Sequence, residues 1–139
     1  MTGNDKTKKP GGPERRMFLK GTTIFKEGEA ADAAYIVESG RVEVFKMIAG
    51  RRIPLGVIRE WGMFGELGLV DDSPRMAGAF SLEDTVCLVV TQRSVSQMLD
   101  AAPPGLATVI ESMAQTLRSA GEDLAQARYQ LLEFTSPGS

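Results

Sequence analysis

The residues with the clearest chemical potential lie in one short stretch, Phe64–Ala77, with the sequence FGELGLVDDSPRMA. Arg75 can offer a forked pair of donors to a phosphate. Glu66 is an acceptor suited to a sugar hydroxyl. Gly65 and Gly68 permit close backbone approach by a ligand, and amides at the start of the helical turn between them form an anion site. Together these groups predict a site for a compact phosphorylated sugar.

The composition excludes several other kinds of site. The 139 residues include no His, so the chain has no His-ligated metal, no Ser-His-Asp or Cys-His nucleophile pair, and no imidazole that titrates near neutral pH. A net charge of -2 argues against broad electrostatic attraction to nucleic acid. The single cysteine, Cys87, lies in an apolar run and is predicted to be a small buried hydrophobe; no disulfide can form within the chain.

From Met17 to about Val90 the sequence consists of short apolar runs separated by turn residues, which is typical of antiparallel β-structure. The segments 42–47 and 53–58 flank Ala49-Gly50 and predict a hairpin, in which Pro54 indicates an edge or irregular strand. We therefore expect a β-roll or sandwich rather than a parallel α/β sheet.

After Val90 the apolar period changes from two to about 3.6. Thr91 is the expected N-cap of a short helix through Leu99, and a long helix is expected from near Gly105. Gly121 lowers helix propensity by about 1 kcal/mol and suggests a hinge between two helical pieces. An apolar stripe predicts either a coiled coil or a helix packed on the β-domain; it comprises Leu106, Ile110, Met113, Leu117, Ala120, Leu124, Ala127 and Leu131.

The chain is expected to form one domain, 16–134, with a β-roll over 16–90 and helices over 92–134. Residues 1–15 are predicted to be a flexible basic tail, which either contacts an acidic partner or membrane surface or is a solvated leader; 135–139 are predicted to be a second flexible tail. The sequence has no signal peptide or membrane span, so we expect a cytoplasmic location.

The stretch Gly21–Val44, taken together with Phe64–Ala77, resembles the cyclic nucleotide-binding domain family. The resemblance covers about Arg16 to Arg118. It implies a mainly β fold with C-terminal helices: an eight-stranded β-roll with a phosphate-binding cassette between two strands, followed by a short helix and a long lid helix.

The resemblance implies that Glu66 accepts the ribose 2′-hydroxyl, that Arg75 pairs with the cyclic phosphate, and that Val44 lies near the base. Arg118 or Arg128 is expected to cover the base. The full set of predicted ligand-binding residues is Val44, Gly65, Glu66, Leu67, Gly68, Arg75, Met76, Ala77, Arg118 and Arg128.

Two residue types in the cassette bear on the ligand. Met76 has no hydroxyl to offer to the guanine amino group, which favours cAMP over cGMP. Asp71 and Asp72 would weaken anion binding if they pointed inward, and we expect them to face solvent.

The predicted function is a non-catalytic regulatory module that binds cAMP, possibly cGMP, and signals through movement of its C-terminal helix. No metal, no other cofactor, no direct nucleic acid binding and no membrane span are expected. The effector would be another protein or a parent chain, and a homodimer could form through the C-terminal helix. The alternatives are a ligand-free structural or dimerisation module of the same fold and a cupin-type enzyme, which the missing histidines disfavour.

Overall fold

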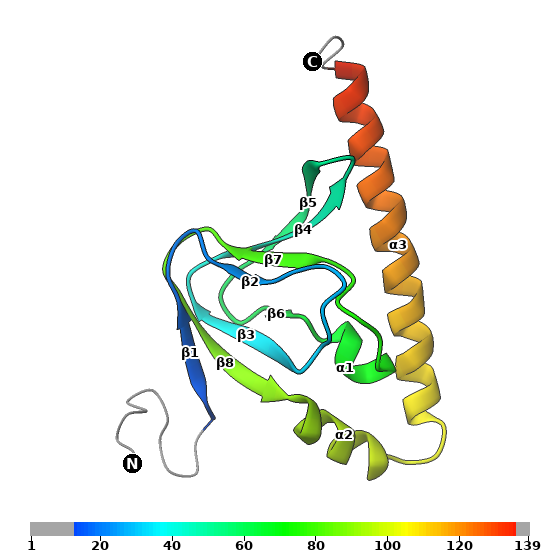
Figure 1. Cartoon of the computed structure of the whole chain (residues 1–139). Coiled ribbons are helices and arrows are strands. Elements are labelled where there is room, and N and C mark those ends of the chain that lie inside the picture. The colour runs from blue at the N-terminus through cyan, green and yellow to red at the C-terminus, as the bar shows by residue number, and fades with distance from the viewer. Residues whose placement is uncertain (1–12, 136–139) are drawn as a thin grey trace.

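The computed structural model describes residues 13–135, which form two antiparallel β-sheets and three helices (Figure 1). One sheet has the strand order β1-β8-β3-β6 and the other the order β2-β7-β4-β5. The expected mainly β fold with C-terminal helices is therefore confirmed. The strands are β1 (Arg15–Phe18), β2 (Thr23–Phe25), β3 (Ala33–Ser39), β4 (Val42–Ile48), β5 (Arg51–Ile58), β6 (Met63–Phe64), β7 (Gly78–Ser81) and β8 (Thr85–Thr91).

The predicted hairpin is formed by β4 and β5, which pair from Val42 with Ile58 to Ile48 with Arg51, with a shift of register between Val44 and Phe45. Ala49 and Gly50 both have positive φ, 52° and 78°, as expected of a tight two-residue turn whose backbone matches the right-handed twist of the flanking strands. As predicted, Pro54 lies on an edge strand, because β5 is the last strand of its sheet.

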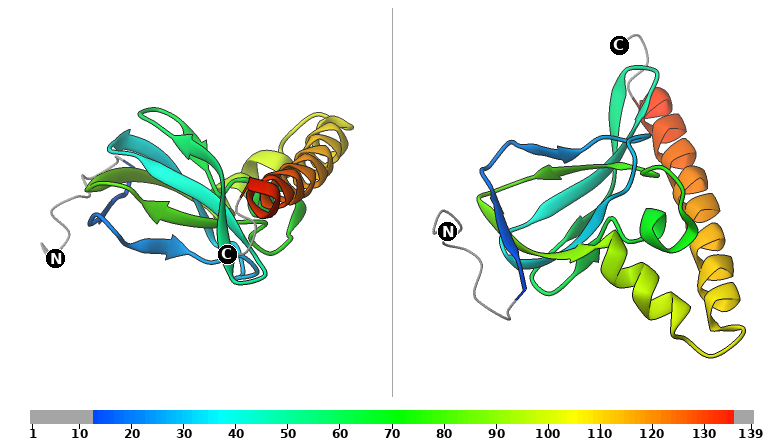
Figure 2. Two further views of the ribbon diagram at one scale, coloured as in Figure 1. Left: turned by 90° about the horizontal axis from the view of Figure 1, so that it is seen from above. Right: turned by 60° about the horizontal axis from the view of Figure 1, so that its bottom comes forward.

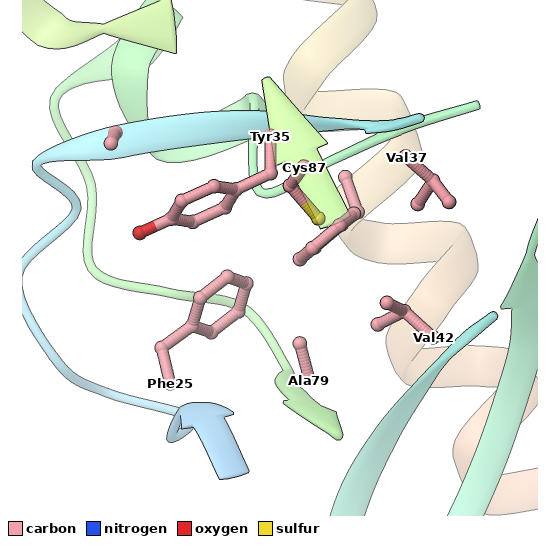
Figure 3. Packing of buried hydrophobic residues seen from close by; sticks show 8 residues of the cluster. Phe25, Tyr35, Val37, Val42, Ala79 and Cys87 are labelled. Atoms are coloured by element: carbon pink, nitrogen blue, oxygen red, sulfur yellow. The ribbon is translucent and has the colours of Figure 1, made fainter. Parts of the chain in front are cut away.

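The core lies between the two sheets, where side chains from both meet (Figure 3). Tyr35 and Cys87 come from one sheet and Phe25 from the other, and Phe64 stacks on Tyr35 with ring centroids 5.3 Å apart. Cys87 is fully buried, as predicted, and burial raises the pKa of its thiol to about 11. This aromatic core continues to the residues that line the candidate site, since Phe25 and Phe64 belong to both.

Three helices follow or interrupt the roll: α1 (Leu67–Asp71), α2 (Gln92–Asp100) and α3 (Leu106–Thr135). The short helix α2 begins as predicted, since the Thr91 hydroxyl accepts a hydrogen bond from the Ser94 amide at 3.1 Å. The expected hinge at Gly121 is wrong: α3 is one continuous helix of 30 residues through this position. Figure 1 shows α3 running along one side of the roll, from α1 to the β4–β5 hairpin.

Two faces of α3 differ in residue size. The face toward the roll carries small side chains, and the only buried residues of the helix are Ala114 and Ala125. Large apolar side chains on an adjacent face remain exposed, Leu131 to 61%. Most of the stripe found in the sequence is therefore not the surface that packs on the β-domain. Figure 2, seen from above, shows the helix standing at one side of the sheets.

The predicted tails, 1–15 and 135–139, each overlap the described residues slightly, and Thr135 is the last residue of α3 rather than part of a flexible tail. Strand β1 begins at Arg15, so the last residue of the predicted N-terminal tail belongs to a sheet. The predicted flexibility of 1–12 and 136–139 lies outside the described residues. Within 13–135, no helix has the length and apolar character needed to span a bilayer.

Candidate functional site

A cavity of about 380 Å³ lies between the roll and the middle of α3. Strands β4 and β5 contribute mainly apolar side chains to its wall, and the segments 63–68 and 75–77 contribute the residues of the predicted cassette. Only two of the lining residues, Glu66 and Arg75, carry ionisable side chains. Helix α3 closes the cavity with Leu117, Ala120, Gly121 and Leu124.

Arg75 is a buried cation in the cavity wall, with 5% of its surface exposed. Its Nη1 donates to the Gly65 carbonyl at 2.9 Å, and its Nη2 donates to Oδ1 of Asp32 at 3.3 Å. The guanidinium lies 3.9 Å from the centroid of the Phe25 ring, a cation–π distance. Its Nε is buried and has no hydrogen-bond partner among the described residues. Burial lowers the pKa of Arg75, and nearby acidic groups oppose that shift.

The backbone of Arg75 is fixed by the turn between β2 and β3. Its amide donates to the Glu29 carbonyl at 2.8 Å, and the Gly28 amide donates to the Arg75 carbonyl at 2.8 Å. Gly28 has φ of 88°, a conformation that glycine adopts without strain. Gly28 is thus part of the structure that positions the arginine.

The two cassette glycines give room to the protein itself. A Cβ at Gly65 would lie 2.8 Å from Nη1 of Arg75 and 3.1 Å from the Phe25 ring. A Cβ at Gly68 would lie 2.6 Å from the Ser73 carbonyl oxygen. The close approach expected of a ligand is made at these positions by neighbouring residues, so the glycines are needed to build the site.

Glu66 immediately precedes α1 and is partly buried in the cavity wall. Burial raises the pKa of its carboxyl group, an effect that its own backbone amide partly offsets. Among the described residues, its carboxylate has no ion-pair partner. A carboxylate in this setting is available to accept a hydrogen bond from a hydroxyl group.

The structure brings eight of the ten predicted site residues to the cavity wall: Val44, Gly65, Glu66, Leu67, Gly68, Arg75, Met76 and Ala77. Arg118 and Arg128 do not line it. Arg128 donates to the Pro54 carbonyl at 2.8 Å, on the β4–β5 hairpin. Arg118 pairs with Asp71 at 2.6 Å, on α1.

This pairing also corrects the expectation for Asp71. We expected both aspartates of the cassette to face solvent, but the Asp71 side chain is only 7% exposed because Arg118 covers it. The Arg118 guanidinium lowers the pKa of the Asp71 carboxyl group.

Sequence reasoning missed two side chains that hold Arg75, namely Phe25 beneath the guanidinium and Asp32 beside it. No local pattern singles them out, since Asp32 is 43 positions away. In the part of the chain that the structure describes, no three His, Cys, Asp or Glu side chains are grouped so as to hold a metal ion. The site can thus offer one cation, one desolvated carboxylate and an apolar wall.

The family model described as "Cyclic nucleotide-binding domain" matches residues 15–102, more than half of the chain. The chain belongs to this family. The domain is 30% identical over 112 residues to the cyclic AMP receptor protein of Thermus thermophilus, covering 80% of this chain and 52% of that protein. It is 28% identical over 104 residues to the cAMP-dependent protein kinase regulatory subunit of Pyricularia oryzae, covering 75% of this chain and 26% of that protein.

Solved structures agree with this assignment. The cAMP-bound form of the EAL enzyme Bd1971 matches with a TM-score of 0.73 and 31% identity, over 87% of this chain and 33% of that one. The Thermus thermophilus catabolite activator protein matches with a TM-score of 0.62 and 29% identity, over 88% and 55%. The cyclic nucleotide-binding domain described here therefore spans about half, or less, of these relatives. It is of the type found in cAMP receptor proteins and kinase regulatory subunits.

Proposed function

We propose that this chain is a non-catalytic regulatory domain that binds a cyclic nucleotide, with Arg75 pairing with the cyclic phosphate and Glu66 accepting a hydrogen bond from the ribose 2′-hydroxyl. The observation that carries this proposal is the incompletely bonded Arg75 in the cavity wall. Buried polar groups nearly always have partners, so an unpaired guanidinium nitrogen indicates capacity for an anion. The cAMP-bound form of a relative, the EAL enzyme Bd1971, supports cyclic nucleotide binding.

The remaining lining residues suit the rest of such a ligand. Backbone amides near Gly65, Leu67, Met76 and Ala77 would complete the phosphate site, and Val44 would lie near the base, in the apolar part of the wall. A mostly apolar pocket with a few placed polar groups is the usual form of a small-molecule site.

The proposed ligand is cAMP rather than cGMP. Met76 lines the cavity and has no hydroxyl group for the guanine amino group. A buried polar edge left without a partner costs about 1–3 kcal/mol, which disfavours cGMP. Met76→Thr should therefore narrow the difference between the two affinities, and an unchanged difference would contradict this assignment.

The proposed output is movement of α3. Four residues of this helix form part of the cavity wall, so a bound nucleotide contacts the helix directly. A ligand that binds one position of α3 more tightly than another shifts the population toward that position. The signal would be received by a separate effector protein or by the rest of a longer parent chain.

A second candidate function, dimerisation through α3, is favoured by the large apolar side chains that remain exposed along it: Leu106, Val109, Met113, Leu117, Leu124, Leu131 and Phe134. Successive members are three, four or seven residues apart, which is compatible with a coiled-coil seam, and two of them, Leu117 and Leu124, also line the cavity. This role is compatible with nucleotide binding and would make the signal a property of the dimer.

Titration calorimetry with cAMP and cGMP tests the proposed function. Arg75→Ala should weaken cAMP binding by about 100-fold or more, because it removes one partner of a desolvated charge pair. Arg52 provides a matched control, since it lies 4.0 Å from the Phe80 centroid and pairs with Glu43 but does not line the cavity. Arg52→Ala should bind cAMP as the unaltered protein does. An absence of heat with both nucleotides, or unchanged binding by Arg75→Ala, would refute the proposal.

A further inference from the structure

Arg118 lies outside the cavity but is bonded to the segment that ends in the phosphate-binding arginine. Its Nε and Nη2 donate to the two carboxylate oxygens of Asp71 at 2.6 and 2.9 Å. Its Nη1 donates to the Pro74 carbonyl at 3.2 Å. The ion pair is largely shielded from water, with side chains 18% and 7% exposed. Forked pairs of this kind fix geometry as well as adding energy.

One contact of Arg118 is with the Pro74 carbonyl, which belongs to the peptide bond directly before Arg75. Asp71 is the last residue of α1, and its Oδ1 also accepts a hydrogen bond from the Ser73 amide at 3.2 Å. The turn therefore depends on Asp71, and Pro74 follows it. On its other side Arg75 is bonded to the Gly28–Glu29 turn. Arg75 is thus held between the β-roll and α3.

A second contact between α3 and the cassette lies one turn further along the helix. A Cβ at Gly121 would meet Cε of Met76, so Met76 packs into the space that the glycine leaves. Arg118 and Gly121 share a helix face because they are three residues apart. Through these two residues α3 contacts the chain on both sides of Arg75, and Figures 1 and 2 show α1 beside α3.

We propose that Arg118 is a positioning residue for the nucleotide: it acts through Asp71 and Pro74 to set the place of Arg75, and it does not touch the ligand. This inference rests on the proposed function and names how α3 is coupled to that site. It differs from the expectation that Arg118 covers the base. The pair has a second effect, because Arg118 neutralises a carboxylate four residues before the phosphate-binding arginine. Without Arg118, that carboxylate would repel the incoming phosphate.

Three variants separate this role from direct contact with the ligand: Arg118→Ala, Asp71→Asn and the double variant. Arg118→Ala should weaken cAMP binding by about tenfold, within the usual range for coupling between sites. Because Arg118 acts through Asp71, adding Arg118→Ala to Asp71→Asn should change the affinity by less than about twofold. A full tenfold loss in the Asp71→Asn background would mean that Arg118 does not act through its ion pair with Asp71, and would overturn the proposal.

Arg118→Lys and Glu133→Gln complete the series. Lysine keeps the charge but loses the fork, so Arg118→Lys should bind cAMP better than Arg118→Ala and less well than arginine. Glu133 forms the other ion pair between α3 and the roll seen in the described residues, with Arg51 at 3.0 Å, away from the cavity. Glu133→Gln should leave cAMP affinity unchanged, and a loss equal to that of Arg118→Ala would overturn the proposal. Urea unfolding verifies that each variant is folded.

Hydrogen exchange keeps this test separate from the proposed function. If the unaltered protein binds neither cAMP nor cGMP, the proposed function fails, but the positioning of 71–77 by Arg118 remains measurable. The backbone amide hydrogens of 71–73 and 75–77 should exchange faster in ligand-free Arg118→Ala and Asp71→Asn than in Glu133→Gln. Equal exchange in all three variants would overturn the positioning role.

Discussion

At the scale of single residues, Arg75 and Asp32 form an unequal pair. The Arg75 side chain is 3% exposed, whereas that of Asp32 is 85% exposed. Water screens the carboxylate, so the pair contributes little energy despite the burial of its cation. An anion that enters the cavity can therefore replace Asp32 as the partner of Arg75 at small cost.

Removing the charge of Asp32 tests this view. Asp32→Asn keeps an oxygen acceptor beside Arg75 but removes a negative charge that competes with the phosphate. We expect cAMP to bind about threefold more tightly, the scale of a screened ion pair. Calorimetry at one ionic strength gives the comparison. A clear loss of affinity would instead show that the carboxylate is needed to orient Arg75.

The Asp71–Arg118 pair predicts how stability depends on pH. The folded-state pKa of Asp71 is lowered, so its contribution is present above the unfolded-state pKa and is lost as pH falls through the folded-state pKa. Asp71→Asn should lower the free energy of unfolding by about 1–3 kcal/mol at neutral pH. The difference should shrink below about pH 4, where the unfolded carboxyl group protonates. Urea unfolding across this pH range measures it, and a difference independent of pH would contradict the assignment.

Some of these residue roles were accessible from sequence and others were not. Glu66 and Arg75 are indicated by residue type within one short stretch, and both reach the cavity wall. The burial of Asp71 was missed, because its partner Arg118 is 47 positions away on α3. Charge alone places an aspartate in solvent, and only the tertiary structure supplies the arginine that covers it.

At the scale of elements, α3 and the cassette fit together because a large side chain on the cassette, Met76, packs against a glycine on the helix, Gly121. Met76 occupies the space above Gly121, and both line the cavity. The sequence suggested a hinge at Gly121 because helix propensity is a local property. In the structure Gly121 has a different role, because the absence of a side chain leaves space for Met76.

Gly121→Ala tests this fit. Alanine favours the isolated helix by about 1 kcal/mol, but its Cβ would meet the flexible end of Met76 and displace it within the cavity wall. We therefore expect weaker cAMP binding without loss of helix content. The double variant Gly121→Ala with Met76→Ala should bind cAMP about as tightly as Met76→Ala alone, because the alanine at position 121 then has no methionine to displace. Identical binding by Gly121→Ala and the unaltered protein would show that the contact is unimportant to the site.

At the scale of the whole molecule, the two-sheet roll and its helices were predictable, because strand alternation, turn residues and the Thr91 cap are local signals. Which face of α3 packs on the roll was not predictable. The apolar stripe marks the more hydrophobic face, but the approach to the roll is made at small residues such as Ala114 and Ala125.

The exposed stripe leads to a prediction about assembly. Sedimentation of the unaltered protein should reveal a dimer formed through α3, because burying the exposed side chains of Leu131 and Phe134 against a second copy removes apolar surface from water. Leu131→Glu should shift the protein toward monomer, whereas Gln130→Glu, which adds the same charge next to it, should not. A monomer at all concentrations, with and without cAMP, would exclude this assembly.

The length of α3 gives the Arg118 contact a mechanical consequence. From Arg118 to Thr135 the helix extends roughly 25 Å at 1.5 Å per residue. A tilt of about 10° about Arg118 would therefore carry the far end about 4 Å sideways. Buried Ala125 resists that displacement near the middle of this segment, and beyond it the exposed polar contacts from Arg128 and Glu133 to the β4–β5 hairpin add little energy. A small rotation of α3 at the cassette is therefore amplified at the C-terminal end of the helix.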